Sequence, residues 1–204
     1  MAKIKAVFDA DILFHIVKTG YQFYAKQLIT KAYIAEYVYD HEIKKGTREG
    51  KAIELLEEMK IVEILYEKKL NANQKVIYQA AIEILDRQPI QEGEKRTAAF
   101  AKAYNLNYYM SDDNNAASFI KVSAGVNIIN FCDLLLMHLH VFGKDSVAEL
   151  TYYYNEFVKL YETGKEPNLI KDNGRVLPFK DVIIRCMTKF MQEDELKTLL
   201  ESLK

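Results

Sequence analysis

Two pairs of aspartates in this sequence each follow a short apolar run. Asp9 and Asp11 come directly after the run IKAVF, and Asp112 and Asp113 come shortly after the run YYM. Neither Asp9 nor Asp113 has a lysine or arginine within three residues along the chain. Carboxylates brought together without counter-charges repel one another, show raised pKa values, or bind a metal ion. Because hard oxygen ligands suit Mg²⁺ or Mn²⁺, this pattern favours a divalent-metal site.

Two further acids lie at predicted helices and are candidates for the same site. Glu94 opens an alanine-rich helix after a turn bracketed by Pro89 and Gly93, and a helix near Val38 supplies Asp40 or Glu42. Each acid also has an ordinary structural explanation. Any of the aspartates is a good helix N-cap, and a glutamate in a first turn interacts favourably with the helix dipole. Only the joint pattern favours a site.

The elements that position these acids are predicted to alternate between strand and helix. Apolar runs predict strands at 3–9, 32–35, 61–66, 108–110 and 126–130, with helical spacing between them. The run 32–35 is alternatively the start of a helix, and 61–66 is alternatively the continuation of one. This alternation predicts an α/β fold with a mostly parallel central sheet flanked by helices. In open parallel sheets functional groups gather at the carboxyl ends of strands, where these aspartates lie.

The C-terminal part of the chain has a different pattern. After Phe131 no strand is predicted, and leucine and aromatic residues recur at helical spacing, with a last helix that includes Leu196 and Leu203. We therefore expect two domains, an α/β domain over 1–140 and an all-helical C-terminal extension over 141–204.

Composition limits the class of protein. The chain has 204 residues and a net charge of −1, which disfavours a charge-driven nucleic-acid binder but allows a local basic groove. The sequence contains no uninterrupted apolar run of 18 or more residues, so a membrane span is not expected. The opening residues MAKIKAVFDA reach Asp9 too early for a secretory signal. Cys132 and Cys186 lie among apolar neighbours and are expected to be buried thiols, so a cytoplasmic protein is expected.

The order of these motifs resembles that of the PIN-domain nucleases over roughly residues 3–140. The matching stretches are AVFDADILFHI, YIAEYVYDHEI, GEKRTAAFAKAYNLNYYMSDD and GVNIIN. The spacing from the glutamate through the alanine-rich helix and the strand to the aspartate pair is the most specific part.

The resemblance implies a role for each matching residue. Asp9, Glu42, Glu94 and Asp113 match the four family acids, with Asp9, Glu94 and Asp113 holding a Mg²⁺ or Mn²⁺ ion. Ser111 matches a hydroxyl that orients the first acid. The extra acids Asp11 and Asp112 are candidate metal ligands, and Asp112 is an alternative to Asp113. The member of the aspartate pair that does not bind metal is expected to cap the next helix. Glu36 and Asp40 are rivals of Glu42.

The implied activity is metal-dependent hydrolysis of RNA phosphodiester bonds, in which the metal activates water and shields phosphate oxygens. Lys95 and Arg96 follow Glu94 and are candidates for contacting phosphate, or form a solvated helix face. Possible partners are an antitoxin or other protein that controls a toxin-like nuclease, and a second copy of the chain.

Two other interpretations compete with this one. The first is a catalytically inactive PIN-like module whose C-terminal helices bind protein. The second is an unrelated phosphohydrolase in which the DAD motif at Asp9 resembles that of haloacid-dehalogenase-type phosphatases. It ranks last because the bulky Ile12 and Leu13 follow the motif and the expected later lysine and threonine strand ends are not evident.

Overall fold

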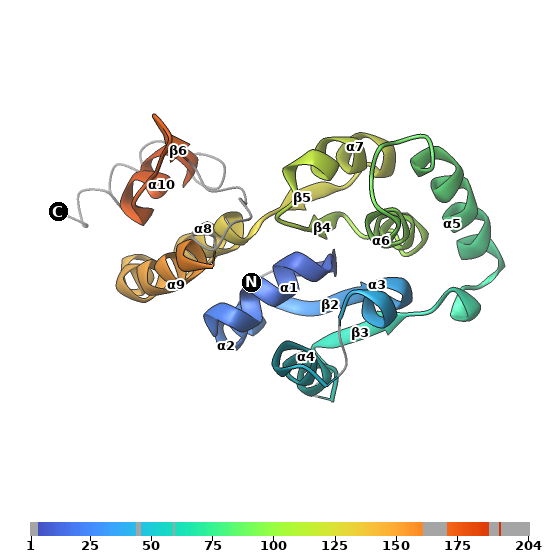
Figure 1. Cartoon of the computed structure of the whole chain (residues 1–204), viewed down its shortest axis with the longest axis horizontal. Helices are drawn as coiled ribbons and strands as arrows, with labels where there is room; N and C mark the ends of the chain where they lie inside the picture. The colour runs from blue at the N-terminus through green and yellow to red at the C-terminus, as the bar shows by residue number, and fades with distance from the viewer. Residues whose placement is uncertain (1–3, 44–45, 59, 161–170, 188–191, 193–204) are drawn as a thin grey trace. The chain divides into compact units, whose positions relative to one another are not determined.

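The computed structural model describes residues 4–43, 46–58, 60–160, 171–187 and 192 (Figure 1). The chain divides into two compact units, residues 1–130 and 131–204. The boundary predicted at residue 140 falls inside the helix α8 (Phe131–Phe142), which belongs to the second unit and packs against α9 (Val147–Lys159). The α/β unit therefore ends with its last strand.

The first unit is built on a five-stranded sheet in which every neighbouring pair is parallel. The strand order is β3-β2-β1-β4-β5. The strands are β1 (Ile4–Phe8), β2 (Ile29–Ala35), β3 (Val62–Leu65), β4 (Tyr108–Met110) and β5 (Asn127–Ile129). The predicted α/β class with a parallel central sheet is confirmed. The two ambiguous runs are both strands.

Helices cover both faces of this sheet. They are α1 (Ala10–Thr19), α2 (Gln22–Leu28), α3 (Glu36–His41), α4 (Arg48–Glu58), the 3₁₀ turn η1 (Glu67–Lys69), α5 (Ala72–Leu85), α6 (Glu92–Ala103) and α7 (Asn114–Ala124). Figure 1 shows α6, with α5 outside it, on one side of the sheet and α1, α2 and α4 on the other.

The helix α6 is buried all round at its centre, where a full turn of mostly small residues lets it pack closely on the sheet. Ala98, Ala99 and Ala101 are fully buried, as is Phe100, and α6 contacts β1, β2 and β4. The helix begins at Glu92, two residues before the predicted start. Gly93, predicted to end a turn, is therefore already helical.

The order of the strands places β1 beside β4. The chain moves outward from β1 to β2 and β3, then crosses to the opposite side of β1 to form β4 and β5. The junction of β1 and β4 is therefore the topological switch point, where loops following neighbouring strands diverge to opposite sides. In open α/β sheets, ligands bind at the carboxyl ends of the strands at this point.

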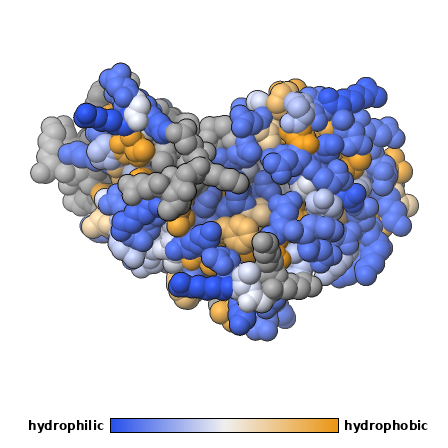
Figure 2. Space-filling view, viewed as in Figure 1, coloured by the Kyte–Doolittle hydropathy of each residue, from blue (hydrophilic) through white to orange (hydrophobic). Residues whose placement is uncertain are grey.

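The outer faces of some helices carry exposed apolar side chains. In α7, Ala116, Ile120 and Ala124 are buried, while Phe119 and Val122 are exposed. Figure 2 shows an orange patch in this region. None of the described helices is long and apolar enough to cross a membrane.

The second unit is mainly helical, as predicted, but contains a hairpin that the sequence analysis missed. Its described elements are α8, the 3₁₀ turn η2 (Lys144–Ser146), α9, β6 (Lys171–Asp172), β7 (Arg175–Val176) and α10 (Phe179–Cys186). β6 and β7 pair antiparallel around Asn173 and Gly174, both with positive φ. Cys132 is buried, whereas Cys186 is only partly so. The predicted last helix, with Leu196 and Leu203, lies outside the described residues.

Candidate metal and nucleic-acid site

The two aspartate pairs meet at the switch point of the sheet. Asp9 follows β1 and caps α1, accepting a hydrogen bond of 2.9 Å from the Ala10 N–H. The Asp9 N–H in turn donates to the Met110 carbonyl over 3.0 Å, which ties the exit of β1 to the exit of β4. Residues about a hundred positions apart therefore lie side by side because their strands are neighbours.

Ser111 links the two aspartate pairs. Its hydroxyl lies 3.4 Å from Asp9 Oδ2 and 3.4 Å from Asp11 Oδ2, and it accepts a 3.0 Å hydrogen bond from the Asp113 N–H. The hydroxyl has one proton and can donate it to only one carboxylate at a time. The structure thus places Ser111 where it can orient Asp9.

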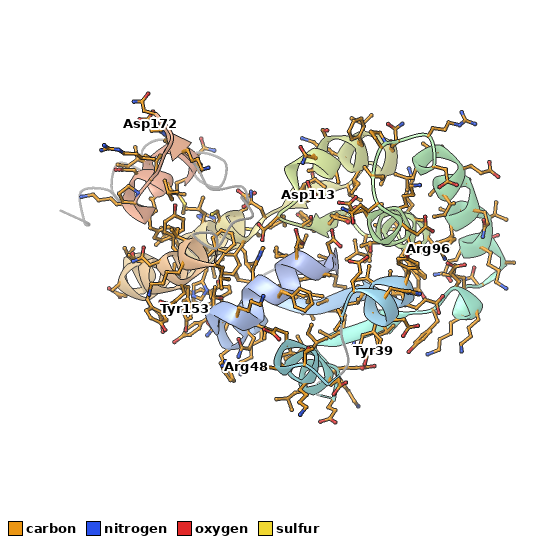
Figure 3. All side chains as sticks on the ribbon, viewed as in Figure 1. Tyr39, Arg48, Arg96, Asp113, Tyr153 and Asp172 are labelled. Atoms are coloured by element: carbon orange, nitrogen blue, oxygen red, sulfur yellow. The ribbon has the colours of Figure 1, made fainter. Side chains whose placement is uncertain are left out.

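The two neighbours Asp112 and Asp113 have different surroundings. Asp112 is buried, and its Oδ2 lies 2.5 Å from His15 Nδ1. Asp113 is at the start of α7, where its Oδ1 accepts from the Asn115 N–H over 2.7 Å (Figure 3). Asp113 lines the cavity described below, and Asp112 does not. Asp113 therefore both caps α7 and lines the cavity, whereas Asp112 does neither. Which of the two binds a metal, and so whether the other one is the cap, stays a prediction.

Glu42 lies at the C-terminal end of α3 and points toward the start of α6. A Cβ atom added to Gly93 would lie 1.9 Å from Glu42 Oε1 and 3.2 Å from a methyl carbon of Val38. The absence of a side chain at Gly93 is what lets Glu42 lie there. Of its rivals, Glu36 accepts a 2.8 Å hydrogen bond from the Glu67 N–H, Asp40 is exposed, and neither lines the cavity.

Glu94 lies in the first turn of α6 as part of a capping box. Its Oε2 accepts a 2.7 Å hydrogen bond from the Gln91 N–H, and its side chain is almost completely buried. This box has a sequence signature, a polar cap with glutamate three residues later, which also marks where the helix begins. The cap positions Glu94 at the cavity without supplying a positive charge.

The two basic residues that follow Glu94 are paired with other acids. Lys95 Nζ lies 3.0 Å from Asp86 Oδ1. Arg96 lies 2.6 Å from Glu92 Oε1 and also pairs with Glu67. Neither Lys95 nor Arg96 lines the cavity.

The acids surround a cavity of about 260 Å³, which we call the carboxylate cavity. Its described lining consists of Asp9, Ala10, Asp11, Phe14, Glu42, Gln91, Glu94 and Asp113. This lining contains five carboxylates and no lysine or arginine. Phe14 and Gln91 were not among the predicted site residues. Phe14 lies between core positions of α1, and nothing in the local sequence separates it from them.

Burial and mutual repulsion perturb these acids. Burial raises the pKa of Asp9 to about 6, and the charge of Asp113 adds to the effect, although hydrogen bonds from Ala10 and Ser111 oppose it. Burial, followed by the charges of Asp9 and Asp112, raises the pKa of Asp11 to about 8.

The two glutamates behave in the same way. Burial raises the pKa of Glu42 to about 7, with a further contribution from the charge of Asp9. Burial also raises the pKa of Glu94 to about 7, and the charges of Asp9, Asp113 and Glu42 act in the same direction. Such perturbed acids in one cleft are characteristic of functional sites.

The donors suit a hydrated divalent ion. In the described part of the chain, no group of three His, Cys, Asp or Glu side chains is spaced to hold a metal by itself. Mg²⁺, however, usually keeps several waters and is held through one or two carboxylates. Since a water molecule takes about 30 Å³ of liquid volume, the carboxylate cavity has room for an ion with part of its hydration shell.

The comparisons with known proteins add no assignment to this geometry. The sequence matches no protein-family model, and no curated protein matches it either.

Proposed function

We propose that this protein is a metal-dependent endoribonuclease that hydrolyses RNA phosphodiester bonds at the carboxylate cavity. The observation that carries the proposal is that carboxylates from separate elements face one cavity at the switch point of a parallel sheet, with no basic residue in its described lining. The choice of RNA follows from the resemblance to PIN-domain nucleases. A cytoplasmic location belongs to the same proposal.

In this proposal each cavity residue has a separate role. Asp9, Glu94 and Asp113 would hold Mg²⁺ or Mn²⁺, directly or through water, and Glu42 would hold a bound water. Ser111 would orient Asp9 through its hydroxyl, which lies 3.4 Å from Asp9 Oδ2. The bound ion would supply an activated water and neutralise charge on the phosphate. No histidine is needed as a general base in this scheme.

The test combines metal binding with cleavage. We expect Mn²⁺ at about a hundred times its Kd to stabilise wild type by about 2.7 kcal/mol, or roughly 5–10 °C in Tm. Asp9→Asn and Asp113→Asn should lose this shift and lose cleavage of single-stranded RNA by about 100-fold or more. Both amides keep the oxygen that accepts the helix-capping hydrogen bonds, so the folds should remain intact.

Asp112→Asn is the matched control because Asp112 is the neighbour of Asp113 but does not line the cavity. It should keep most of the metal shift and most of the cleavage. Equal losses in Asp112→Asn and Asp113→Asn would contradict the assignment of Asp113.

A non-catalytic binding module is the second candidate. The observation that favours it is that no three described ligands are spaced to hold a metal by themselves. Wild type that shows neither a Mn²⁺ shift nor cleavage would support the module over the nuclease.

A further inference from the structure

An aromatic ring forms part of the wall of the carboxylate cavity. Phe14 of α1 is partly exposed and lines the cavity, whose other described lining residues are polar or alanine. The ammonium group of Lys18, one turn further along, lies 5.7 Å from the centre of the Phe14 ring. An apolar ring beside carboxylates that hold a divalent ion would suit a ligand with a flat aromatic face next to an anionic group that the ion neutralises.

A second aromatic surface lies on α3, next in sequence to Glu42, which lines the cavity. His41, the residue before Glu42, is exposed, and its ring stacks on that of Tyr37 with centroids 4.2 Å apart and planes inclined by 19°. His41 Nδ1 also lies 3.0 Å from the Tyr37 carbonyl oxygen. The stack and this contact hold the His41 ring in one orientation.

The stack continues inward to a fixed cation. The Arg96 guanidinium carbon lies 5.2 Å from the centre of the Tyr37 ring. Arg96 is itself held by Glu92 and Glu67. The ion pairs of Arg96 therefore hold one end of a stack of three groups, the Arg96 guanidinium, the Tyr37 ring and the exposed His41 ring. Figure 3 labels Arg96 on α6.

Two exposed lysines lie in η1, the turn that contains Glu67, one of the partners of Arg96. Lys68 and Lys69 of η1 lie 5.4 Å and 4.5 Å from the centre of the Tyr66 ring, and both are exposed. The hydrogen bond from the Glu67 N–H to Glu36 joins η1 to α3. Aromatic faces combined with nearby cations are the means by which proteins bind single-stranded nucleic acid without reading its sequence.

We propose that Phe14 and His41 are base-stacking platforms beside the carboxylate cavity, so that single-stranded RNA binds with a base on each and a phosphodiester between them. The inference rests on the proposed function and extends it to the residues that recognise the substrate. The bases of a duplex cannot stack on these rings, because each base is already stacked between its neighbours within the RNA double helix. Duplex RNA of the same sequence should therefore bind much more weakly.

The experiment uses the full chain with a short single-stranded RNA that carries the fluorescent base 2-aminopurine, in Ca²⁺ to slow cleavage. Stacking on an aromatic ring quenches this fluorophore. Phe14→Leu keeps the apolar volume but removes the aromatic face, and His41→Ala removes the exposed end of the stack. Each should weaken the Kd about 5- to 100-fold, the range for the loss of one stacked base. Each should also lose part of the quenching.

The chain offers a matched control for each variant. Phe23 of α2 has Lys26 at the same 5.7 Å from its ring centre and is 61% exposed, but it does not line the cavity. His140 of α8 is an exposed histidine near a helix end. Phe23→Leu and His140→Ala should change the Kd by less than about twofold.

The outcomes separate the two proposals. If both Phe14→Leu and His41→Ala kept the Kd and the quenching of wild type, the proposal of stacking platforms would be overturned. The nuclease proposal would still stand if cleavage depended on Asp9. Equal affinity for duplex RNA would also overturn the platforms. Wild type that neither binds nor cleaves RNA would overturn both.

Discussion

Two acids in the first turn of α6 lie only two residues apart and have opposite surroundings. Glu92 accepts a charged hydrogen bond from Arg96, which also pairs with Glu67 and stacks on Tyr37. Glu94 is buried, lines the carboxylate cavity, and accepts a hydrogen bond from the backbone N–H of Gln91. Within one helix turn, Glu92 is therefore neutralised by a neighbouring cation, whereas Glu94 faces other acids.

This contrast extends to the surfaces on either side of α6. On the η1 and α5 side, Glu67 accepts a 2.7 Å hydrogen bond from the Tyr78 hydroxyl, and Asp86 pairs with Lys95. On the cavity side, the acids face one another, and burial together with mutual repulsion raises their pKa values. Lysines and arginines are available on the other side of α6. The absence of a basic residue from the described cavity lining is therefore a property of the site and does not follow from the composition of the chain.

The largest expected effect comes from comparing these two glutamates directly. Glu94→Gln should reduce RNA cleavage by about 100-fold or more, because it removes a proposed metal ligand while keeping the capping hydrogen bond. Glu92→Gln should leave cleavage within about twofold. It should lower the unfolding free energy by roughly 0.5–1 kcal/mol, since it weakens one partly exposed ion pair.

Single-turnover cleavage and thermal unfolding of both variants measure the two effects. If Glu92→Gln lost as much activity as Glu94→Gln, the distinction between the paired and the unpaired face of α6 would fail.

The second effect is the dependence of stability on pH in the absence of metal. Folding raises the pKa of Asp9 from 3.8 to about 6, and those of Asp11, Glu42 and Glu94 to about 8, 7 and 7. Between about pH 4 and 8 the folded state therefore holds more protons than the unfolded state, and stability falls as pH rises.

Asp9 alone should cost on the order of 2–3 kcal/mol between pH 4 and pH 8, or roughly 5–10 °C in Tm. Thermal unfolding across this range in EDTA measures the loss, and Asp9→Asn should reduce it. Glu92→Gln, which removes an acid that does not line the cavity, is the matched control and should keep the loss. A metal-free Tm that rises steadily from pH 5 to 8 would show that folding does not raise the pKa values of the cavity acids.

The sequence supplied the positions of the strongest site residues because they depend on local rules. Asp9 and the pair at 112–113 follow apolar strands, and the carboxyl ends of neighbouring parallel strands lie together. What local rules could not decide was which of Asp112 and Asp113 faces the cavity. That choice depends on His15, which lies 97 residues away from Asp112.

Other misses had a signal that was available in the sequence. Gln91 and Glu94 match a capping box, which would have started α6 at its observed residue. The dipeptide Asn173-Gly174 is a strong hairpin signal, and it forms the turn between β6 and β7. The role of Phe14 had no such signal, because a partly exposed ring in a helix resembles a core residue until the cavity beside it is known.

The smallest expected effect comes from Gly93. The sequence pattern predicts that this residue ends a loop, but it lies in the first turn of the helix α6. Its backbone is helical, so replacement by alanine would by itself stabilise the helix by up to about 1 kcal/mol. The new Cβ, however, would lie 1.9 Å from Glu42 Oε1, so the flexible Glu42 side chain must move away. The contact with Val38 at 3.2 Å leaves little room for a shift of α6 instead.

We therefore expect Gly93→Ala to leave Tm within about 3 °C of wild type while cleavage falls roughly tenfold. Glu42→Gln measured in parallel provides the reference for a cavity that has lost the Glu42 charge. If Gly93→Ala cleaved RNA as fast as wild type, the position of Glu42 against α6 would not matter for activity. The residues that determine the activity would then have to be sought among the ion-paired residues on the other side of α6.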